Sequence, residues 1–345
     1  MQYDFLVLYP INPTTWATYR EACSPSRAKD DPRDADYRLE WLIPQRARLR
    51  AWRPEDAKTR TLPYRVAPRR RRVNDRTRIS HRMTALLNAY FPQVLQWVED
   101  IRTTLVCAVL RRWPTGESSK KVRPAPRDKF CHAHHAMRKE TISNRMAAIK
   151  EAVPLTTDQA VMTSSVLMLK ALATQMKTTI AAIRELDHEL EKRCRTPEDS
   201  HLLAALPGAG PVDTARLTAA MGTARDSWTT VDQLLCCSGV APVMDRRGQS
   251  TWSRWRYFCP KFLRQSFPED AGEAIHHSFW ARAYYLSPRA RGKSHQAAVS
   301  ALAFKWIRIM YKCWQTRTPY SAVRYLERLR KKGSPLLAFA ASNPS

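Results

Sequence analysis

Two aspartates spaced three residues apart, Asp31 and Asp34, are the first residues in the chain whose types could do chemistry. Asp31 precedes Pro32, and an Asp-Pro pair is typical of an N-cap followed by the first residue of a helix. That helix is predicted to run to about Ile43, with Asp34 on the same side of its first turn. Two interpretations stay open: the pair stabilises the helix start through capping and the helix dipole, or it binds a divalent metal.

A glycine-containing turn is the second candidate. The segment Leu206-Pro-Gly-Ala-Gly-Pro211 predicts a tight turn between two apolar helical segments. Gly208 and Gly210 would leave backbone N–H groups free to face a phosphate, as in hairpins that hold a nucleic-acid backbone without reading bases. Turns of this composition also join helices that bind no ligand, so the turn alone does not show whether a phosphate is bound.

The overall charge narrows the class of partner. The 345 residues include 58 Lys and Arg against 31 Asp and Glu, which gives a formal net charge of +27. This excess favours a polyanion, either nucleic acid or an anionic membrane surface. No window approaches the roughly eighteen uninterrupted apolar residues of a membrane span. We therefore expect nucleic acid and no membrane.

The positive charge is concentrated in segments. Between Arg46 and Arg82 there are fourteen Lys and Arg against three acids, and between Arg289 and Lys332 there are twelve against Glu327 alone. A charge run is usually only a solvated face, but this density favours a surface that contacts phosphates. The densest run consists of four consecutive arginines: Arg69, Arg70, Arg71 and Arg72.

A further segment alternates cations with aromatic rings. The cations are Arg254, Arg256, Lys261 and Arg264, and the rings are Trp252, Trp255, Tyr257 and Phe258. This mixture suits phosphate contact and base stacking, although the rings could equally belong to a core. The alternation of Trp255 with Tyr257 predicts that at least one of them packs inward.

The cysteines and histidines argue against a disulfide framework or a zinc site. Eight cysteines occur without a Cys-x-x-Cys pair, and Cys236 adjoins Cys237, so we expect a reduced, cytoplasmic protein. The start of the chain has neither the basic region nor the cleavage pattern of a signal peptide. In Cys131-His-Ala-His-His135 the ligands are too close in sequence for the usual zinc spacing, which favours a surface helix.

The remaining pattern is mostly helical. Residues 3–8 are predicted to form a short buried strand, followed by a helix near residues 14–22. Asn74 is predicted to cap a helix that ends near Pro92, and a second helical segment spans about residues 94–112. A polar linker is expected from Trp113 to Pro126, and a frayed tail from Ala338 to Ser345.

From Met162 to about Arg193 the apolar residues fall into heptads. The seam positions are Met162, Leu169, Leu172, Met176, Ile183, Leu186 and Leu190. A seam this narrow favours packing against a partner helix in a coiled coil, while packing within the chain's own domain stays the alternative. Near Ala298 to Trp314, an amphipathic helix is expected to bury Leu302, Trp306 and Ile309 and to present its basic residues outward.

Several short motifs together resemble the DEDD transposases of insertion sequence family 110, the IS116/IS110/IS902 group. They are Tyr9-Pro-Ile-Asn-Pro13, Lys29-Asp-Asp-Pro-Arg-Asp-Ala35, the Pro-Gly-Ala-Gly-Pro turn, Cys237-Ser-Gly-Val-Ala-Pro242, Cys259-Pro-Lys-Phe-Leu-Arg264, Ala281-Arg-Ala-Tyr-Tyr285, Arg291-Gly-Lys293 and Ala301-Leu-Ala-Phe-Lys-Trp306. The resemblance covers nearly the whole chain, and its C-terminal motifs are the most specific.

The resemblance implies an RNase H-like domain in which four acids hold two divalent metal ions (Mg²⁺) for phosphodiester chemistry. Asp31 and Asp34 match the last two of these acids. The first Asp and the Glu have no counterpart, since only thirty residues precede Asp31. We therefore expect either a start further upstream or a truncated copy.

The resemblance also implies a catalytic serine in the C-terminal domain, a homo-oligomer assembled through the coiled coil, and a structured guide RNA besides DNA. Arg247 stands at the serine position, before Gly248, and an arginine cannot be that nucleophile. Ser250 is the nearest hydroxyl that could substitute, and the other interpretation is an ordinary polar loop residue.

These expectations combine into one organisation. We predict a mainly α protein: an RNase H-like remnant (1–60), a basic helical region (61–157), a coiled-coil helix (158–196), a C-terminal transposase domain with a helix-hairpin-helix-like turn (197–335) and a tail (336–345). The hypothesis is a transposase or recombinase that binds DNA but is catalytically impaired. The alternative is a basic DNA- or RNA-binding protein without enzymatic activity.

Overall fold

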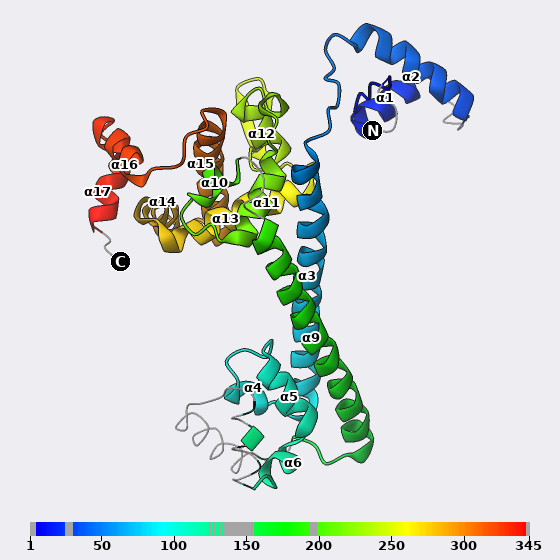
Figure 1. Ribbon diagram of the computed structural model, residues 1–345, viewed down its shortest axis with the longest axis vertical. Coiled ribbons are helices and arrows are strands. Elements are labelled where there is room, and N and C mark those ends of the chain that lie inside the picture. Colours follow the sequence, from blue (N-terminus) through cyan, green and yellow to red (C-terminus); the bar gives the residue numbers. More distant parts are fainter. Residues whose placement is uncertain are drawn as a thin grey trace. The chain divides into compact units, whose positions relative to one another are not determined.

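The computed structural model describes residues 5–24, 30–123, 126, 129, 130, 133, 153, 155–193 and 199–342. The chain divides into two compact units, residues 1–56 and residues 57–345. Helices dominate both units, as the sequence predicted (Figure 1). The histidine-rich segment 131–135 lies outside the described residues except for Ala133.

The first unit contains two helices. Helix α1 (Pro13–Cys23) begins at Asn12, whose side chain accepts a hydrogen bond from the Thr14 N–H at 2.9 Å. Helix α2 (Asp31–Gln45) has Asp30 as its N-cap, so the prediction that Asp31 caps the helix was wrong by one residue. The helix also continues through Pro44 and ends two residues beyond the predicted end near Ile43, although this proline lacks the backbone N–H that would bond to the preceding turn.

The predicted buried strand at residues 3–8 is wrong for its described part. Phe5 to Leu8 are all exposed, with Phe5 79% exposed. Leu8 forms a single antiparallel bridge to Trp52, whose N–H donates to the Leu8 carbonyl at 2.7 Å. A strand is buried only where neighbouring strands and a packed layer cover it, and the described residues of this unit supply one bridge. The RNase H-like remnant is therefore not confirmed.

Two long helices form the frame of the second unit (Figure 1). Helix α3 (Ala57–Tyr90) is continuous, so the prediction that Asn74 begins a helix was wrong. Prolines 63 and 68 lie inside it, where each removes a backbone donor. The helix persists because its buried residues Leu62 and Val66 at one end and Met83 and Leu87 at the other pack along its whole length.

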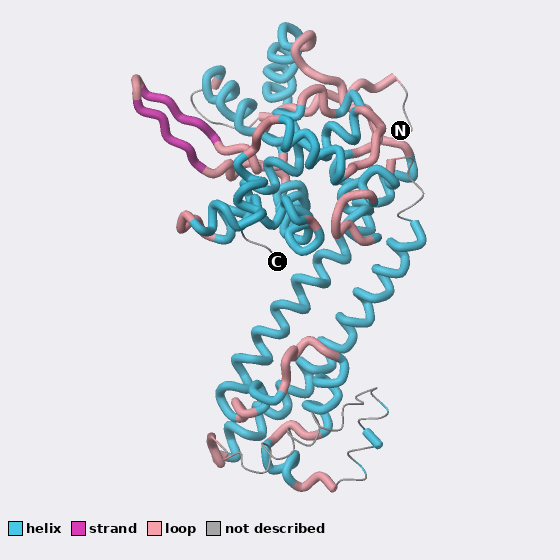
Figure 2. Tube along the Cα trace, turned by 90° about the vertical axis from the view of Figure 1, so that its left-hand side faces the viewer, coloured by secondary structure: helices cyan, strands magenta, loops and turns pink. Residues whose placement is uncertain are grey.

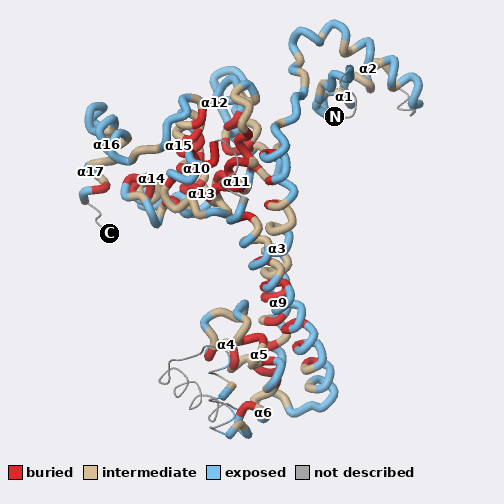
Figure 3. The backbone as a smooth tube through the Cα atoms, viewed as in Figure 1, coloured by how far each residue is buried: buried red, intermediate tan, exposed pale blue. Residues whose placement is uncertain are grey.

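Helix α9 (Gln159–Arg193) packs antiparallel against α3. Leu190 of α9 shares a cluster with Leu62 of α3, while Leu169 and Met176 share another with Met83. Figure 3 shows the buried residues following the line where the two helices meet. The heptad seam is therefore covered within the chain, by α3 and by α5 (Thr104–Arg112), which was the alternative to packing against a partner helix.

By length and composition, α9 is also the one helix in the described part of the chain that could cross a membrane. Of its most apolar window, 39% is buried inside the protein, and the core helix of a folded protein passes the same test. The seam buries Leu169, Leu172 and Met176 of this helix, whereas Leu167 and Met168 are exposed.

Short helices complete the hydrophobic cluster around the N-terminal half of α9. The predicted segment 94–112 is divided into α4 (Val94–Trp97) and α5, because Thr103 caps α5 by accepting a hydrogen bond from the Val106 N–H at 3.2 Å. Helix α6 (Gly116–Lys120) lies in the stretch predicted as a linker and begins with a capping box made by Thr115 and Ser118.

The C-terminal part has its own core. Its elements are α10 (Ser200–Ala204), α11 (Pro211–Met221), a 3₁₀ turn (Arg225–Ser227), α12 (Val231–Cys237), β1 (Val243–Arg247), β2 (Ser250–Arg254), α13 (Lys261–His277), α14 (Phe279–Ala290), α15 (His295–Gln315), α16 (Ala322–Lys331) and α17 (Pro335–Ser342). The largest fully buried side chains of this core are Trp280, Trp306 and Trp314.

Two predictions about this part can be compared directly. Leu302 and Trp306 of α15 are buried and Ile309 is half-buried, so the predicted inward face is confirmed. The predicted frayed tail is wrong for residues 338–342, because α17 packs against α14 and buries Ala340.

Candidate nucleic-acid interface

The feature that stands apart from the helices is an antiparallel hairpin, β1–β2, which the sequence analysis missed. Figure 2 shows it projecting from the surrounding helices. Gly248 has φ +57° and is the first of the two residues that connect the strands, which is the position where a type II′ turn requires glycine. The sequence did contain a signal for this hairpin, because Gly248 and Gln249 lie between two polar strands of equal length.

The register of the hairpin places two predicted site residues opposite one another. Arg247 pairs with Ser250 directly beside the turn, and both are exposed. Within the described residues, no hydrogen bond joins the Ser250 hydroxyl to a carboxylate, histidine or lysine. The hydroxyl that could replace the family serine therefore lies at an exposed tip without a base to activate it.

The faces of the hairpin carry cations and a ring. The Arg254 Nε lies 2.7 Å from Asp245 on the neighbouring strand, but both side chains are exposed, so this ion pair contributes little to stability. The Arg247 guanidinium lies 6.0 Å from the centre of the Trp252 ring. Trp252 itself is 55% exposed.

The segment after β2 continues this surface. Trp255, Tyr257 and Phe258 are all exposed, Phe258 to 91%. The prediction that Trp255 or Tyr257 packs into the core was therefore wrong. Uncovered aromatic side chains next to arginines are suited to stacking on bases.

Arg256 differs from its neighbours because its guanidinium makes contacts within the protein. Its Nε donates to the Ala241 carbonyl at 3.3 Å, and a terminal nitrogen lies 3.6 Å from the Cys236 sulfur. These contacts join the end of β2 to the segment that precedes β1. Arg256 therefore holds the base of the hairpin, while Lys261 and Arg264 at the start of α13 are exposed.

The arginine run on α3 is largely used inside the protein. Arg69 pairs with Asp187 of α9, and Arg70 pairs with Glu269 of α13, Nη2 to Oε1, at 2.7 Å. Glu269 also pairs with Arg216 of α11, so this carboxylate joins three helices. Of the run, Arg71 and Arg72 are exposed and remain available to an external anion. Arg72 lies 3.7 Å from Asp75.

The predicted turn Leu206–Pro211 joins α10 to α11. Gly208 has φ +84°, and a Cβ there would lie 2.7 Å from the His277 ring of α13, so this glycine allows a close approach between the turn and that helix. A Cβ on Gly210 would meet nothing within 4 Å. The turn thus has a packing role at Gly208, and the helix-hairpin-helix interpretation is not confirmed.

The two predicted metal ligands lie on α2. Asp31 is exposed, whereas the Oδ1 atom of Asp34 lies 2.8 Å from Nε of Arg20 on α1, with both side chains mostly buried. Among the described residues, no group of three or more Asp, Glu, His or Cys side chains could hold a metal ion. The donor set described here does not fit the pair of divalent ions that the family implies, because one of its two carboxylates already neutralises an arginine.

Comparisons with known proteins agree with the sequence motifs. Residues 2–92 match the DEDD transposase family of IS110, and residues 200–286 match the transposase family IS116/IS110/IS902. A candidate transposase of the IS117 mini-circle from Streptomyces coelicolor is 26% identical over 347 aligned positions, which cover 97% of this chain and 80% of that protein.

Two further relatives match over part of their length. The uncharacterised 42 kDa protein of IS900 from Mycobacterium paratuberculosis is 26% identical over 43% of this chain and 38% of its own length. The uncharacterised 44.8 kDa protein of IS116 from Streptomyces clavuligerus is 28% identical over 41% of this chain and 35% of its own length. The chain belongs to the IS110 family of insertion-sequence transposases.

Proposed function

We propose that this chain binds DNA as part of an insertion-sequence transposition system and that its strand-exchange chemistry is impaired. The observation that carries the proposal is the hairpin β1–β2 with the segment that follows it. This surface leaves Trp252, Trp255, Tyr257 and Phe258 exposed next to Arg246, Arg247 and Arg254.

Exposed aromatic rings favour binding of a ligand that covers them. An uncovered Trp or Phe forgoes the free energy of burial, and a stacked base recovers part of it at about 1–3 kcal/mol per base. Arginines beside the rings supply the charge that attracts phosphates, and a two-stranded ribbon is narrow enough to enter a major groove. Together these features favour nucleic acid over an acidic protein surface.

Impairment of the chemistry is inferred from two sites. Arg247 occupies the position where the family has its serine, and Ser250 opposite it has no activating partner among the described residues. Asp34 is held by Arg20. We therefore derive no metal-dependent step from these residues, and we place the function of the chain in binding.

The resemblance adds a structured guide RNA as a partner, and the cationic surfaces suit its phosphates as well as those of DNA. It also adds a homo-oligomer, which stays a prediction. The buried seam of α9 is not available for that contact, because it packs against α3 and α5 of the same chain.

The test is a binding titration by fluorescence anisotropy with duplex DNA, single-stranded DNA and a structured RNA over a range of salt concentrations. Affinity should fall steeply with salt as counterions are released. Replacing Arg246 and Arg247 by Gln should weaken binding and flatten the salt dependence. Replacing the exposed Lys170 and Lys177 of α9 by Gln serves as the control, because it removes the same number of charges outside the proposed surface. A flat salt response of the unaltered protein would contradict the proposal.

The alternative is a basic DNA- or RNA-binding protein without enzymatic activity, in a packaging or regulatory role. A strand-exchange assay with Mg²⁺ tests the impairment; because this alternative also predicts no product, the assay distinguishes both hypotheses from an active recombinase. A product formed by the chain as written would overturn the impairment. If product forms, Asp31→Asn and Asp34→Asn should abolish it while affinity is kept. If none forms and affinity is high, the binding role stands.

A further inference from the structure

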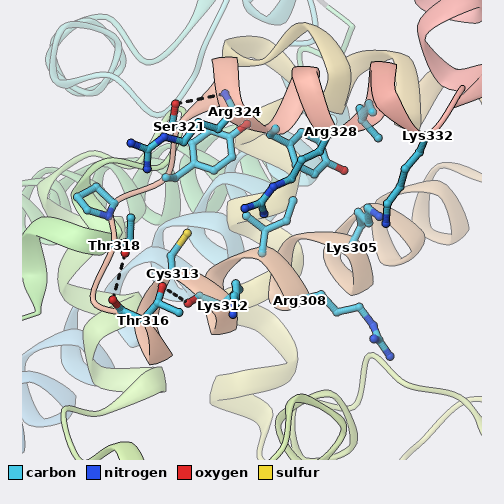
Figure 4. Close-up of a pocket in the computed structure, with 15 residues that line it drawn as sticks. Lys305, Arg308, Lys312, Cys313, Thr316, Thr318, Ser321, Arg324, Arg328 and Lys332 are labelled. Carbon is cyan, nitrogen blue, oxygen red and sulfur yellow. Dashed lines mark hydrogen bonds between the residues drawn. The ribbon is translucent and has the colours of Figure 1, made fainter.

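A second strongly cationic surface lies between helices α15 and α16, away from the motifs that identify the family. It is a groove of about 510 Å³, hereafter the α15–α16 groove, closed at one end by the loop 316–321 (Figure 4). Its basic lining residues are Lys305, Arg308 and Lys312 of α15 with Arg324, Arg328 and Lys332 of α16 and its C-cap. None of the described residues that line it is acidic.

The helical repeat produces this arrangement from the sequence. Residues three or four apart lie on the same side of a helix, about 5–6 Å from one another. The intervals 305–308–312 and 324–328–332 therefore form one row of cations on each helix. Because the two helices face each other across the groove, the rows lie opposite one another (Figure 4). Like charges in such rows repel, so this arrangement favours an anion between them.

Most of these charges have no partner inside the protein. Arg308 pairs with Asp232 of α12 at 3.0 Å, and Figure 4 shows its side chain directed away from the others. The other five cations form no ion pair within the described residues. The exposed Glu327 on α16 does not line the groove.

The wall behind the cations is rigid. The Trp280 indole N–H donates to the Tyr320 hydroxyl at 2.7 Å. The Trp280 ring also packs on Trp306 of α15, with ring centres 4.8 Å apart, and on Tyr325 of α16, at 4.5 Å. These contacts join the loop and both helices to the buried core, so the two rows are held in place before any ligand arrives.

We propose that the α15–α16 groove binds the phosphodiester backbone of a nucleic acid, as a contact separate from the hairpin. Two rows of cations, which rise by seven residue steps from Lys305 to Lys312 and by eight from Arg324 to Lys332, are each about 10–12 Å long. Rows of this length match a linear polyanion better than a single phosphate group. The hydroxyls of Thr316, Thr318 and Ser321 at the closed end are neutral groups of the kind that also contact phosphate oxygens. The groove lacks exposed aromatic rings comparable to those of the hairpin, so it should contact the backbone without reading bases.

This inference rests on the proposed nucleic-acid binding but can fail independently of it. The test compares two double variants on the same helix. Arg324→Gln with Arg328→Gln removes two charges from the groove, and Arg330→Gln with Lys331→Gln removes two charges from residues that do not line it. Both variants change the net charge of the protein equally, and thermal denaturation should confirm that both stay folded.

The readout is the slope of log affinity against log salt, measured for duplex DNA, single-stranded DNA and a structured RNA. Loss of two phosphate contacts should lower the magnitude of the slope by about 1.8 for a duplex and about 1.4 for a single strand. The control variant should leave the slope close to that of the unaltered protein. The polymer for which the slope falls by the full amount expected of two contacts, while the control variant leaves it unchanged, identifies whether the groove holds DNA or RNA.

The outcomes separate the two proposals. Equal effects of the groove and control variants would overturn the groove and leave the hairpin proposal intact, provided that the hairpin variant still weakens binding. Absence of binding by the unaltered protein would overturn both. As a further check, Arg324→Lys with Arg328→Lys should keep the slope, because it keeps the charge.

Discussion

The sulfur of Cys259 lies where a side chain on residue 239 would be. A Cβ built on Gly239 would overlap that sulfur, and Gly239 has φ +71°, a conformation that favours glycine. The two residues stand on either side of the hairpin in sequence, so their contact closes its base. The Cys259 thiol also lies 3.5 Å from the Arg256 carbonyl, to which it donates.

Gly239→Ala should therefore destabilise the protein by about 2–4 kcal/mol, since it adds a steric clash to a left-handed backbone. Urea unfolding measures this. Gly292→Ala is the matched control, because Gly292 has φ +79° and nothing within 4 Å of an added Cβ, so only the backbone cost of about 1–2 kcal/mol should appear. Adding Cys259→Ala to Gly239→Ala should recover part of the loss. Equal costs at the two glycines would argue against a closed hairpin base.

Trp252→Ala should weaken binding of single-stranded nucleic acid by about 1–3 kcal/mol through lost stacking. The melting temperature should change little, since Trp252 is 55% exposed. Tyr64→Ala on α3 is the control, because Tyr64 is 82% exposed and lies outside the proposed interface. A loss of affinity no larger than that of the control would remove Trp252 from the interface.

Asp34→Asn should destabilise the first unit by about 1–3 kcal/mol, because it leaves the mostly buried Arg20 without its carboxylate partner. Asp31→Asn should have almost no effect on stability, since Asp31 is exposed. Hydrogen exchange in α1 and α2 measures both. If the two variants behaved alike, the ion pair would not be what holds these helices together.

Arg70→Gln should cost more stability than Arg71→Gln, although the two arginines are neighbours. Arg70 pairs with Glu269, which also neutralises Arg216, whereas Arg71 is exposed. We expect about 1–3 kcal/mol against less than about 0.5 kcal/mol by urea unfolding. For affinity the order should reverse, with only Arg71→Gln lowering the salt dependence of binding. The same order in both measurements would contradict the assignment of Arg70 to stability and Arg71 to binding.

Stability should also depend on pH through Asp270 of α13. Burial, with a smaller contribution from the nearby Asp213 and Glu273, raises the pKa of this carboxyl to about 7 against the opposing effect of Arg216. The pKa in the folded protein exceeds the unfolded value, so the proton is held more tightly in the folded state. Stability is then greatest below about pH 4 as far as this group is concerned, and it falls by about 1.4 kcal/mol per pH unit between about pH 4 and pH 7.

Urea unfolding between about pH 5 and pH 8 measures this effect. Asp270→Asn should flatten the pH dependence, because the amide does not titrate. Asp232→Asn is the control for the substitution itself, since it makes the same Asp-to-Asn change at an exposed side chain. A steep profile that persists in Asp270→Asn would assign the pH dependence to another group.

The sequence predicted the elements whose patterns are local. A helix near residues 14–22 and a buried face on α15 were both predicted, and the structure has both, as α1 and α15. The predictions were wrong or left open where contacts between residues distant in sequence determine the structure. Asn74 is a good capping residue, but α3 continues through it because α9 and α11 pack along both ends. The seam of α9 has the spacing of a two-stranded contact, and no local feature states that its partner is α3 of the same chain rather than a second copy.

The candidate site was only partly predictable for the same reason. The types of residue at the hairpin indicated nucleic acid, but their exposure depends on the absence of a covering element, which a local pattern does not encode. Conversely, the ion pairs of Arg69 and Arg70 could not be predicted, because their acidic partners lie on α9 and α13, which are distant in sequence.

The position of Arg247 at an uncovered turn has a consequence for how freely this residue can change. Side chains at such a tip contribute little to folding, so exchanging one polar residue for another there should leave stability nearly unchanged. Arg247→Ser therefore meets no structural obstacle, and the fold would accept it without compensating changes elsewhere.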